Sequence, residues 1–434
     1  MSWEQRFLEV LKASRPSFEA LPDWRAPLAL YEGLSPAEAA ELDGTIVAMI
    51  EEDYRNPYSA EEEEQPFGDV MVNLPAGLKP DDLLCMEAAV LVAAERSLGD
   101  AFFRFNRLLR ASRWHALYPR LLWLPRLGME AQQKLAATRA GRCFGAMLGL
   151  AAGDALGVTV EFQSRGEIRR KYPDGFREIL GGGPFGFKQG EWSDDTAMAL
   201  AVARGIAESP DDPVDAVGRH FMAWYDGHPP DVGSTCRMAL EAYRRTGSWA
   251  GAAETVQRQL GERAGGNGAL MRTLPTALAY GKKTAPALAI ARMTHPHPES
   301  DAAVEVYQLV VHALLHGAGK GEALYEGLTK AGPLTERLSR LHTLTEADVR
   351  STGYVVDTLE AALWSFLTTD SLEACILRAV NLGDDTDTVG AVAGGLAGAA
   401  YGPLTLPRRW STVMRGRDQL ETAAQQLFAV SERR

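Results

Sequence analysis

The sequence is poor in cysteine, with only 4 such residues among 434. They lie far apart, in stretches of helical periodicity, and none forms a Cys-x-x-Cys pair. A structural zinc site and a disulfide framework are therefore not expected. Isolated cysteines of this kind are typical of reduced side chains in the core of a cytoplasmic protein. The four residues are Cys85, Cys143, Cys236 and Cys375.

Long apolar runs and excess positive charge are also missing. No stretch approaches the roughly 20 apolar residues of a transmembrane helix, and residues 1–6 lack the basic and apolar parts of a signal peptide. The chain has 45 Lys and Arg against 57 Asp and Glu, a net charge of −12. Because such a chain repels phosphate backbones, we do not expect nucleic acid as a partner. Without a membrane-spanning run or a signal peptide, we expect no membrane partner and a cytoplasmic location.

Strand-like alternation is rare, whereas apolar residues recur at helical spacing. The sequence therefore predicts an all-α protein with its functional residues on loops at helix ends. Gly, Ala and Asp become frequent after Met129, which predicts a smaller, mainly helical domain over residues 1–132 and a second domain over 133–434. Helices are predicted over residues 3–11, 36–50, 83–96 and 100–117, and then over 137–156, 196–207, 214–224, 236–246, 249–260, 269–279, 284–294, 300–317, 321–330, 345–350, 355–368, 371–381 and 388–401.

The first helix of the second domain has a regular glycine pattern. Glycine stands at every fourth position, Gly141, Gly145, Gly149 and Gly153, and so lines one helix face. Such a face lets a second helix approach closely. Charged residues in the same segment argue against a membrane span, so the pattern predicts a tightly packed helix pair within a helical bundle.

Two short stretches concentrate carboxylates and hydroxyls. One is Ser193-Asp194-Asp195-Thr196 and the other is Asp385-Thr386-Asp387-Thr388, and each leads into an apolar helical run. Helix capping explains one such residue in each stretch, but not the paired aspartates. Carboxylates at this density are either solvated or held together by a cation.

The two stretches together favour a metal centre. Asp194, Asp195, Asp385 and Asp387 carry four negative charges, which two divalent cations would neutralise. Oxygen ligands suit Mg²⁺, Mn²⁺ or Ca²⁺ better than zinc, and a pair of such ions can orient substrate oxygens and activate water. The hydroxyls of Ser193 and Thr388 belong to the same predicted ligand set.

Seven motifs occur in a characteristic order between residues 137 and 405. They are Gly-Leu-Ala-Ala-Gly-Asp-Ala-Leu-Gly at 149–157 with Glu161, Trp-Ser-Asp-Asp-Thr at 192–196, Pro-Asp-Val-Gly-Ser-Thr at 230–235, Gly-Asn-Gly-Ala-Leu-Met-Arg at 266–272, Thr-His at 294–295, Gly-Tyr-Val-Val-Asp-Thr at 353–358 and Asn-Leu-Gly-Asp-Asp-Thr-Asp-Thr at 381–388. In this order the chain resembles the ADP-ribosylglycohydrolase family. The resemblance implies an all-α, orthogonally packed fold with two Mg²⁺ or Mn²⁺ ions in a cleft.

The resemblance also implies roles for individual residues. The metal ligands would be Ser193, Asp194, Asp195, Asp385, Asp387 and Thr388, with Asp384 outside the ligand set. Glu161 would be a carboxylate near the metals. Water would attack the anomeric carbon through a cation-like sugar transition state, and Glu161, Asp194 and Asp231 are the candidates for handling the proton.

A second implied set of residues holds ADP-ribose. Asp231 would face the ribose or a guanidinium, the Gly266-Asn267-Gly268 turn would grip the diphosphate, His295 would lie beside the phosphates and Tyr354 would pack on the distal nucleoside. From the residues alone, Asp231 equally fits a turn, Arg272 a buried structural pair and Tyr354 the core. The predicted set is Asp231, Gly233, Gly266, Asn267, Gly268, Met271, Arg272, His295 and Tyr354.

Usual family members lack a counterpart of residues 1–132. This region contains the acidic run Glu61-Glu62-Glu63-Glu64, which could dock on a basic cleft of a partner. Some bacterial members are immunity proteins against ADP-ribosyltransferase toxins, and some of these carry an amino-terminal extension that plugs the active site of the toxin. The alternative is an appendage that stabilises or oligomerises the protein. Three interpretations stay open: an arginine-directed hydrolase serving immunity, a module that mainly occludes a toxin, and a hydrolase of serine-linked or O-acetyl-ADP-ribose. In the first, the substrate is an ADP-ribosylated protein.

Overall fold

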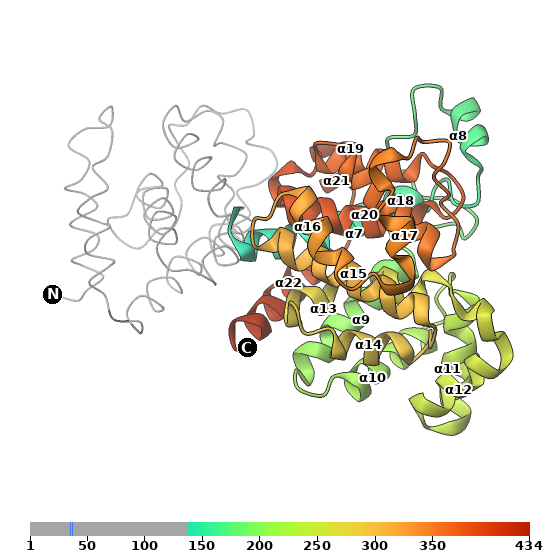
Figure 1. Cartoon of the computed structure of the whole chain (residues 1–434), viewed down its shortest axis with the longest axis vertical. Coiled ribbons are helices and arrows are strands. Elements are labelled where there is room, and N and C mark those ends of the chain that lie inside the picture. The colour runs from blue at the N-terminus through green and yellow to red at the C-terminus, as the bar shows by residue number, and fades with distance from the viewer. Residues whose placement is uncertain (1–34, 36, 38–136) are drawn as a thin grey trace, which may run out of the picture. The chain divides into compact units, whose positions relative to one another are not determined.

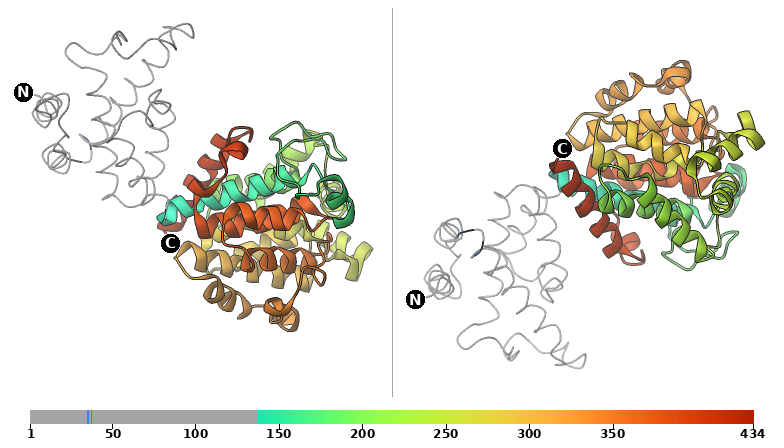
Figure 2. Two further views of the ribbon diagram at one scale, coloured as in Figure 1. Left: turned by 90° about the horizontal axis from the view of Figure 1, so that it is seen from above. Right: turned by 90° about the horizontal axis from the view of Figure 1, so that it is seen from below.

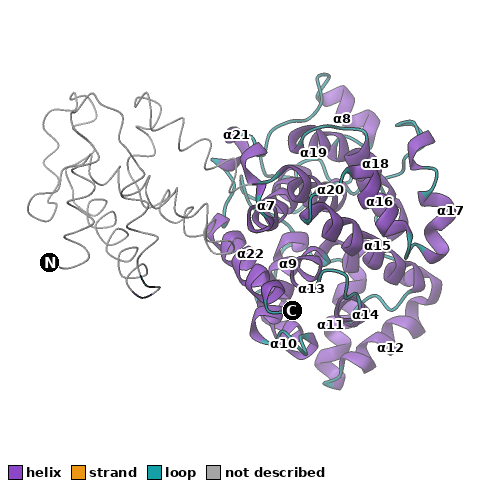
Figure 3. Cartoon of the chain, turned by 60° about the vertical axis from the view of Figure 1, so that its left-hand side comes forward, coloured by secondary structure: helices purple, strands orange, loops and turns teal. Residues whose placement is uncertain are grey.

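The computed structural model describes residues 35, 37 and 137–434. The chain divides into two units, Met1–Thr138 and Arg139–Arg434, and only the second is described below. Its helices are joined by loops, and within residues 137–434 the sole β pairings are three isolated bridges (Figure 3). The all-α prediction is confirmed. The predictions for residues 1–132, including Cys85, lie outside the described residues, and the boundary after residue 132 stays a prediction.

The helices follow one another closely along the chain. The α-helices are α7 (Arg139–Gly157), α8 (Arg165–Lys171), α9 (Asp194–Glu208), α10 (Val214–Asp226), α11 (Ser234–Thr246), α12 (Trp249–Leu260), α13 (Leu274–Tyr280), α14 (Ala285–Arg292), α15 (Pro298–Leu315), α16 (Lys320–Leu328), α17 (Thr335–Leu338), α18 (Val355–Leu367), α19 (Leu372–Val380), α20 (Thr386–Tyr401), α21 (Arg408–Ser411) and α22 (Arg417–Glu432). Short 3₁₀ turns lie between some of them, of which η4 (Asn267–Arg272) belongs to the functional site.

Helices α7 and α20 form the centre of this unit and lie side by side (Figures 1 and 2). Gly149 of α7 lies against Gly394 of α20, and Gly153 lies against Gly390, so the two helices run antiparallel. A side chain at any of these positions would meet the backbone of the other helix. The predicted tight helix pair is thus confirmed, and α20 is the partner.

Other helices cover this pair. Helices α18 and α19 contact α20, whereas α22 contacts both α7 and α9 (Figure 1). Nearly all of α7 and α20 is buried, including their polar residues near the α7 C-terminus and the α20 N-terminus. The N-terminus of α20 lies beside the C-terminus of α7, so the helix pair places these polar residues close together in space.

Several predicted elements differ in the structure. The helix predicted over 269–279 is divided into η4 and α13, with a proline in the first turn of α13. The helix predicted over 345–350 is a turn, because Arg165 donates hydrogen bonds to the carbonyls of Glu346 and Val349 and Asp348 caps Thr345. Helices α8, α17, α21 and α22 were not predicted.

The described part also bears on the cysteines and the membrane. Cys143, Cys236 and Cys375 are buried and free, as expected for reduced core residues. Among the described helices, none combines the length and the apolar character that a membrane span requires.

Candidate functional site

The two acidic stretches meet at helix ends. Ser193 caps α9, which begins at Asp194, and α20 begins directly after Asp385. Helices α7 and α20 approach so closely that a side chain at Gly157 would meet the backbone of Asp387. One turn earlier on α7 lies Asp154, which thereby joins the aspartates of both stretches.

Two groups of three carboxylates can each surround a cation. The first consists of Asp154, Asp195 and Asp387, and the second of Glu161, Asp231 and Asp387. Within each group the ligand oxygens lie within 4.8 Å of one another. Asp387 belongs to both groups, so it connects them.

Unpaired oxygens support cation binding here. Asp195 Oδ1, Asp387 Oδ1 and Glu161 Oε2 are buried without a hydrogen-bond partner. An unpaired buried carboxylate oxygen is costly unless a cation or a proton reaches it. Since all the donors are oxygens, the cluster fits a hard divalent cation rather than zinc.

Hydrogen bonds fix the other predicted ligands around the groups. Both Ser193 Oγ and Thr388 Oγ1 donate to Asp195 Oδ2, over 3.0 and 3.3 Å. Asp194 Oδ2 accepts from the Gly233 N–H over 3.1 Å. Their hydroxyl and carboxylate oxygens therefore face the carboxylate cluster, while their roles as metal ligands stay predictions.

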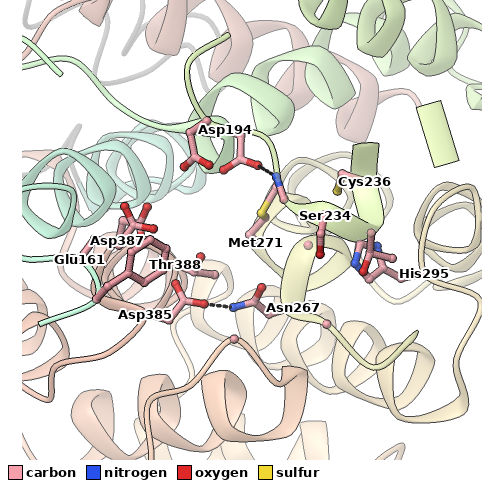
Figure 4. A pocket seen from close by; sticks show the side chains of 17 residues that line it. Glu161, Asp194, Ser234, Cys236, Asn267, Met271, His295, Asp385, Asp387 and Thr388 are labelled. Atoms are coloured by element: carbon pink, nitrogen blue, oxygen red, sulfur yellow. Dashed lines mark hydrogen bonds between the residues drawn. The ribbon is translucent and has the colours of Figure 1, made fainter. Parts of the chain in front are cut away.

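Asp385 is held by a side chain of the predicted phosphate loop. Its Oδ2 accepts a 2.9 Å hydrogen bond from Asn267 Nδ2 (Figure 4). The same Nδ2 also donates to Thr358 Oγ1 over 2.9 Å. The predicted phosphate loop and the second acidic stretch are thus joined through side chains.

The carboxylates perturb one another strongly. Burial, followed by the charges of Asp231, Asp385 and Asp194, raises the pKa of Glu161 to about 9. Burial and the charge of Asp154 raise the pKa of Asp231 to about 6. Raised pKa values show that the negative charges of these carboxylates repel one another, and a bound cation would relieve this repulsion.

The three other acidic members behave in the same way. Burial raises the pKa of Asp194, Asp195 and Asp387 well above the usual range, and neighbouring carboxylates add to the effect. A divalent ion would reverse these shifts by stabilising the charged forms.

Asp154 is a functional residue that the sequence reasoning missed. It is fully buried, its Oδ1 accepts from the Ser193 N–H over 2.8 Å, and its Oδ2 accepts from the N–H and hydroxyl of Thr196 over 2.9 and 2.6 Å. Burial raises its pKa to about 6 against these hydrogen bonds. A carboxylate within an apolar glycine-rich helix was the available signal.

A cavity of about 220 Å³ opens beside the carboxylates. Glu161 and Asp387 lie on one side of it, and Ser234, Cys236 and His295 lie on the other (Figure 4). Of the predicted residues, the cavity wall contains Glu161, Asp194, Asp231, Gly233, Gly266, Asn267, Gly268, Met271, His295, Asp385, Asp387 and Thr388.

Arg272 and Tyr354 are not part of this wall. Arg272 is 1% exposed and donates to Gly268 O and Thr294 Oγ1, with its guanidinium over the ring of Phe221. It therefore supports the loop from beneath, the structural alternative that the sequence left open. Tyr354 is 36% exposed, and its hydroxyl donates to Glu299.

The loop that was predicted to grip the diphosphate is tied to the start of α18. The Asn267 N–H donates to Gly353 O over 3.1 Å, so this amide is already used. His295 is buried beneath the loop, its Nδ1 is 2.7 Å from Thr294 Oγ1, and burial together with Arg272 lowers its pKa to about 3. His295 is therefore neutral at physiological pH.

Phe162 is a second residue that the sequence reasoning missed. It lines the cavity beside Glu161 and is 66% exposed. Phe162 is joined to the second acidic stretch through Asp384, whose backbone forms hydrogen bonds with those of Phe162 and Gln163. The side chain of Asp384 is exposed. The only sequence signal for Phe162 was its position directly after the predicted carboxylate Glu161.

Comparisons with known proteins identify the family of this chain. Residues 135–434 match the family description ADP-ribosylglycohydrolase. The ADP-ribosyl-[dinitrogen reductase] glycohydrolase of Rhodospirillum rubrum is 40% identical over 273 residues, which cover 62% of this chain and 88% of that protein. The ADP-ribosylarginine hydrolase Tri1 of Serratia proteamaculans is 34% identical over 301 residues, which cover 65% and 78%.

A solved structure extends the comparison. An ADP-ribosylglycohydrolase-related protein complex superimposes with a TM-score of 0.56 at 36% identity, and the match covers 68% of this chain and 99% of that chain. The predicted resemblance is confirmed by the sequence and the fold. The chain belongs to the ADP-ribosylglycohydrolase family of enzymes.

Proposed function

We propose that this protein is a metal-dependent hydrolase that removes ADP-ribose from arginine side chains of proteins. The observation that carries the proposal is the pair of carboxylate groups that share Asp387 at the wall of the cavity. Two relatives are named as hydrolases of ADP-ribosylated dinitrogen reductase and of ADP-ribosylarginine.

In the proposed site the carboxylates would hold two Mg²⁺ or Mn²⁺ ions. Asp195 and Asp387 would be ligands, and Glu161 and Asp231 would complete the second group. Asp154 would hold the Ser193–Thr196 segment in place beside them. When bound, such ions polarise substrate oxygens and activate water. Ser193 and Thr388 donate hydrogen bonds to Asp195 and so orient its carboxylate.

The charge of the cavity favours arginine as the leaving group. Glu161, Asp194 and Asp231 all line it, and within the described part no lysine or arginine does. A carboxylate pairs well with the planar, forked guanidinium, whose positive charge also compensates the buried negative charge. A serine-linked or O-acetyl substrate would bring no such charge.

The same carboxylates are the candidates for handling the proton. Asp194 is fixed by the Gly233 N–H, which suits a residue that orients a neighbour. Glu161 and Asp231 line the same cavity, where a positioned carboxylate can accept or donate a proton. We therefore place proton handling with Glu161 or Asp231.

The test compares linkages directly. Full-length protein is incubated with arginine-linked, serine-linked and O-acetyl-ADP-ribose, each with Mg²⁺, with Mn²⁺ and with a chelator. Arginine-linked ADP-ribose should be released fastest, and the chelator should stop release. Faster release from either other substrate would overturn the arginine assignment, and full activity with the chelator would overturn the metal dependence.

A second function concerns the region before residue 135, which the family match does not include. We propose that residues 1–132 bind an ADP-ribosyltransferase toxin, so that the protein acts in immunity. The acidic run Glu61–Glu64 favours a basic partner surface. The test is inhibition of a transferase by a site variant that cannot hydrolyse. A variant that gives no protection would leave hydrolysis as the sole function.

A further inference from the structure

Phe162 has an unusual backbone conformation for its residue type. Its φ is +63°, in the left-handed region where a Cβ atom is unfavourable. Its side chain is nevertheless 66% exposed, so core packing does not explain the conformation. Strain of this kind persists where neighbouring structure imposes it, and it is concentrated at functional sites.

The neighbouring structure that imposes it belongs to the site. Asp384 O accepts from the Phe162 N–H over 2.8 Å, and the Asp384 N–H donates to Gln163 O over 2.9 Å. Asp384 itself has a φ of +58°. Phe162 and Asp384 are thus two of the three non-glycine residues of the described part with positive φ, and they pair with each other.

A second aromatic side chain continues the exposed surface. The rings of Phe162 and Phe185 meet edge to face with centroids 6.3 Å apart. Phe185 is half-buried in a turn that is closed by hydrogen bonds between Gly182 and Phe187. Gly183 in this turn contacts the carbonyl of Val158, which fixes the turn beside the segment that carries Phe162. We call Phe162 and Phe185 the aromatic rim.

The position of the aromatic rim indicates which part of the substrate would contact it. Phe162 follows Glu161, which belongs to the carboxylate groups where the bond to the sugar would be cleaved. The Gly266–Gly268 loop and His295 lie across the cavity from Glu161 (Figure 4). In the proposed binding mode the diphosphate of ADP-ribose would lie on that loop, so the protein that carries ADP-ribose would leave on the opposite side, over the rim.

We propose that the aromatic rim contacts the polypeptide segment next to the ADP-ribosylated arginine of the substrate protein. This inference rests on the proposed function. Apolar side chains of that segment would pack on the rings, while the charged guanidinium enters the acidic cavity. Buried aromatic side chains commonly dominate such contacts.

The experiment uses two substrates for each variant of the full-length protein. One substrate is an ADP-ribosylated protein, and the other is free ADP-ribosyl-arginine, which has no flanking polypeptide. The variants are Phe185→Ser and Phe162→Asn, because asparagine tolerates the left-handed backbone. The control is Tyr325→Ser, since Tyr325 is 73% exposed on α16, outside the cavity wall.

The measured quantity is the ratio of kcat/KM for the protein substrate to kcat/KM for ADP-ribosyl-arginine. It should fall about tenfold in both rim variants, as loss of one well-packed aromatic contact predicts, and it should stay unchanged in the control. Partial unfolding lowers both rates equally and leaves the ratio unaltered.

Two results would overturn the proposal, and they are distinguishable. An unchanged ratio in an active enzyme would remove the rim from substrate recognition while leaving the proposed function intact. A wild-type protein that hydrolyses neither arginine substrate would contradict the proposed function, and the proposal for the rim would fail with it.

Discussion

The carboxylate of Asp154 receives both the backbone N–H and the hydroxyl of Thr196 on its Oδ2, over 2.9 and 2.6 Å. Its other oxygen accepts from the Ser193 N–H. Asp154 thus holds the backbone on either side of Asp194 and Asp195. A buried residue of the glycine-rich helix α7 thereby orients the predicted metal ligands of α9.

This relationship predicts the effect of Asp154→Asn. An asparagine has one acceptor oxygen where three hydrogen bonds are now received, so the Ser193–Thr196 segment should shift. Outer partners of metal ligands usually affect metal affinity about 10–100-fold. The Mg²⁺ concentration for half-maximal hydrolysis should rise by that factor. Thr196→Ser keeps the hydroxyl and should behave like wild type; equal metal requirements in both variants would refute the positioning role.

The shared position of Asp387 gives a second prediction. Because it belongs to both carboxylate groups, Asp387→Asn should weaken both cation sites, with a loss of hydrolysis on the order of 100-fold or more. Bound metal per protein is measured by mass spectrometry and activity by ADP-ribose release. Asp384→Asn is the matched control, because Asp384 is exposed and asparagine keeps its left-handed backbone. Full metal content in Asp387→Asn would contradict this assignment.

The raised pKa values predict a pH dependence of stability in metal-free protein. Glu161 has a pKa of about 9 when folded, whereas an unfolded glutamate titrates near ~4.3. Between these values the folded state binds more protons, so the free energy of unfolding should fall as pH rises. Asp154 and Asp231, with pKa values of about 6, contribute in the same direction at lower pH.

Added metal should reverse this trend, because a divalent ion favours the charged carboxylates and displaces their protons. Thermal unfolding between about pH 5 and pH 9, with a chelator and with Mg²⁺, measures the effect. The gain in Tm from Mg²⁺ should grow with pH. A gain that is constant or shrinks toward high pH would show that these carboxylates do not bind the ion.

The contact between α7 and α20 predicts a stability effect away from the cavity. In Gly149→Ala the new methyl group would meet the backbone of Gly394 on α20. Such overpacking typically costs about 1–3 kcal/mol in the free energy of unfolding. Gly321→Ala on α16 has nothing within 4 Å and should be neutral or stabilising by up to about 1 kcal/mol. Denaturant unfolding of both variants measures the difference, and equal stabilities would argue against the close helix contact.

The sequence by itself determined the local features of this protein. Acidic pairs at Asp194-Asp195 and Asp385-Thr386-Asp387 exceeded what helix capping requires, and so they indicated a cation. The four-residue glycine period indicated a closely approaching helix. Both signals lie within a few residues of chain, where spacing alone specifies which side chains share a face.

The tertiary structure decided which residues act together. It chose α20 as the partner of α7, and this choice brings Asp154 to Asp195 and Asp387, residues far apart in sequence. It also placed Arg272 beneath the loop instead of in the cavity. Burial and long-range contacts depend on which helices pack against each other, and the spacing of residues along the chain does not specify this.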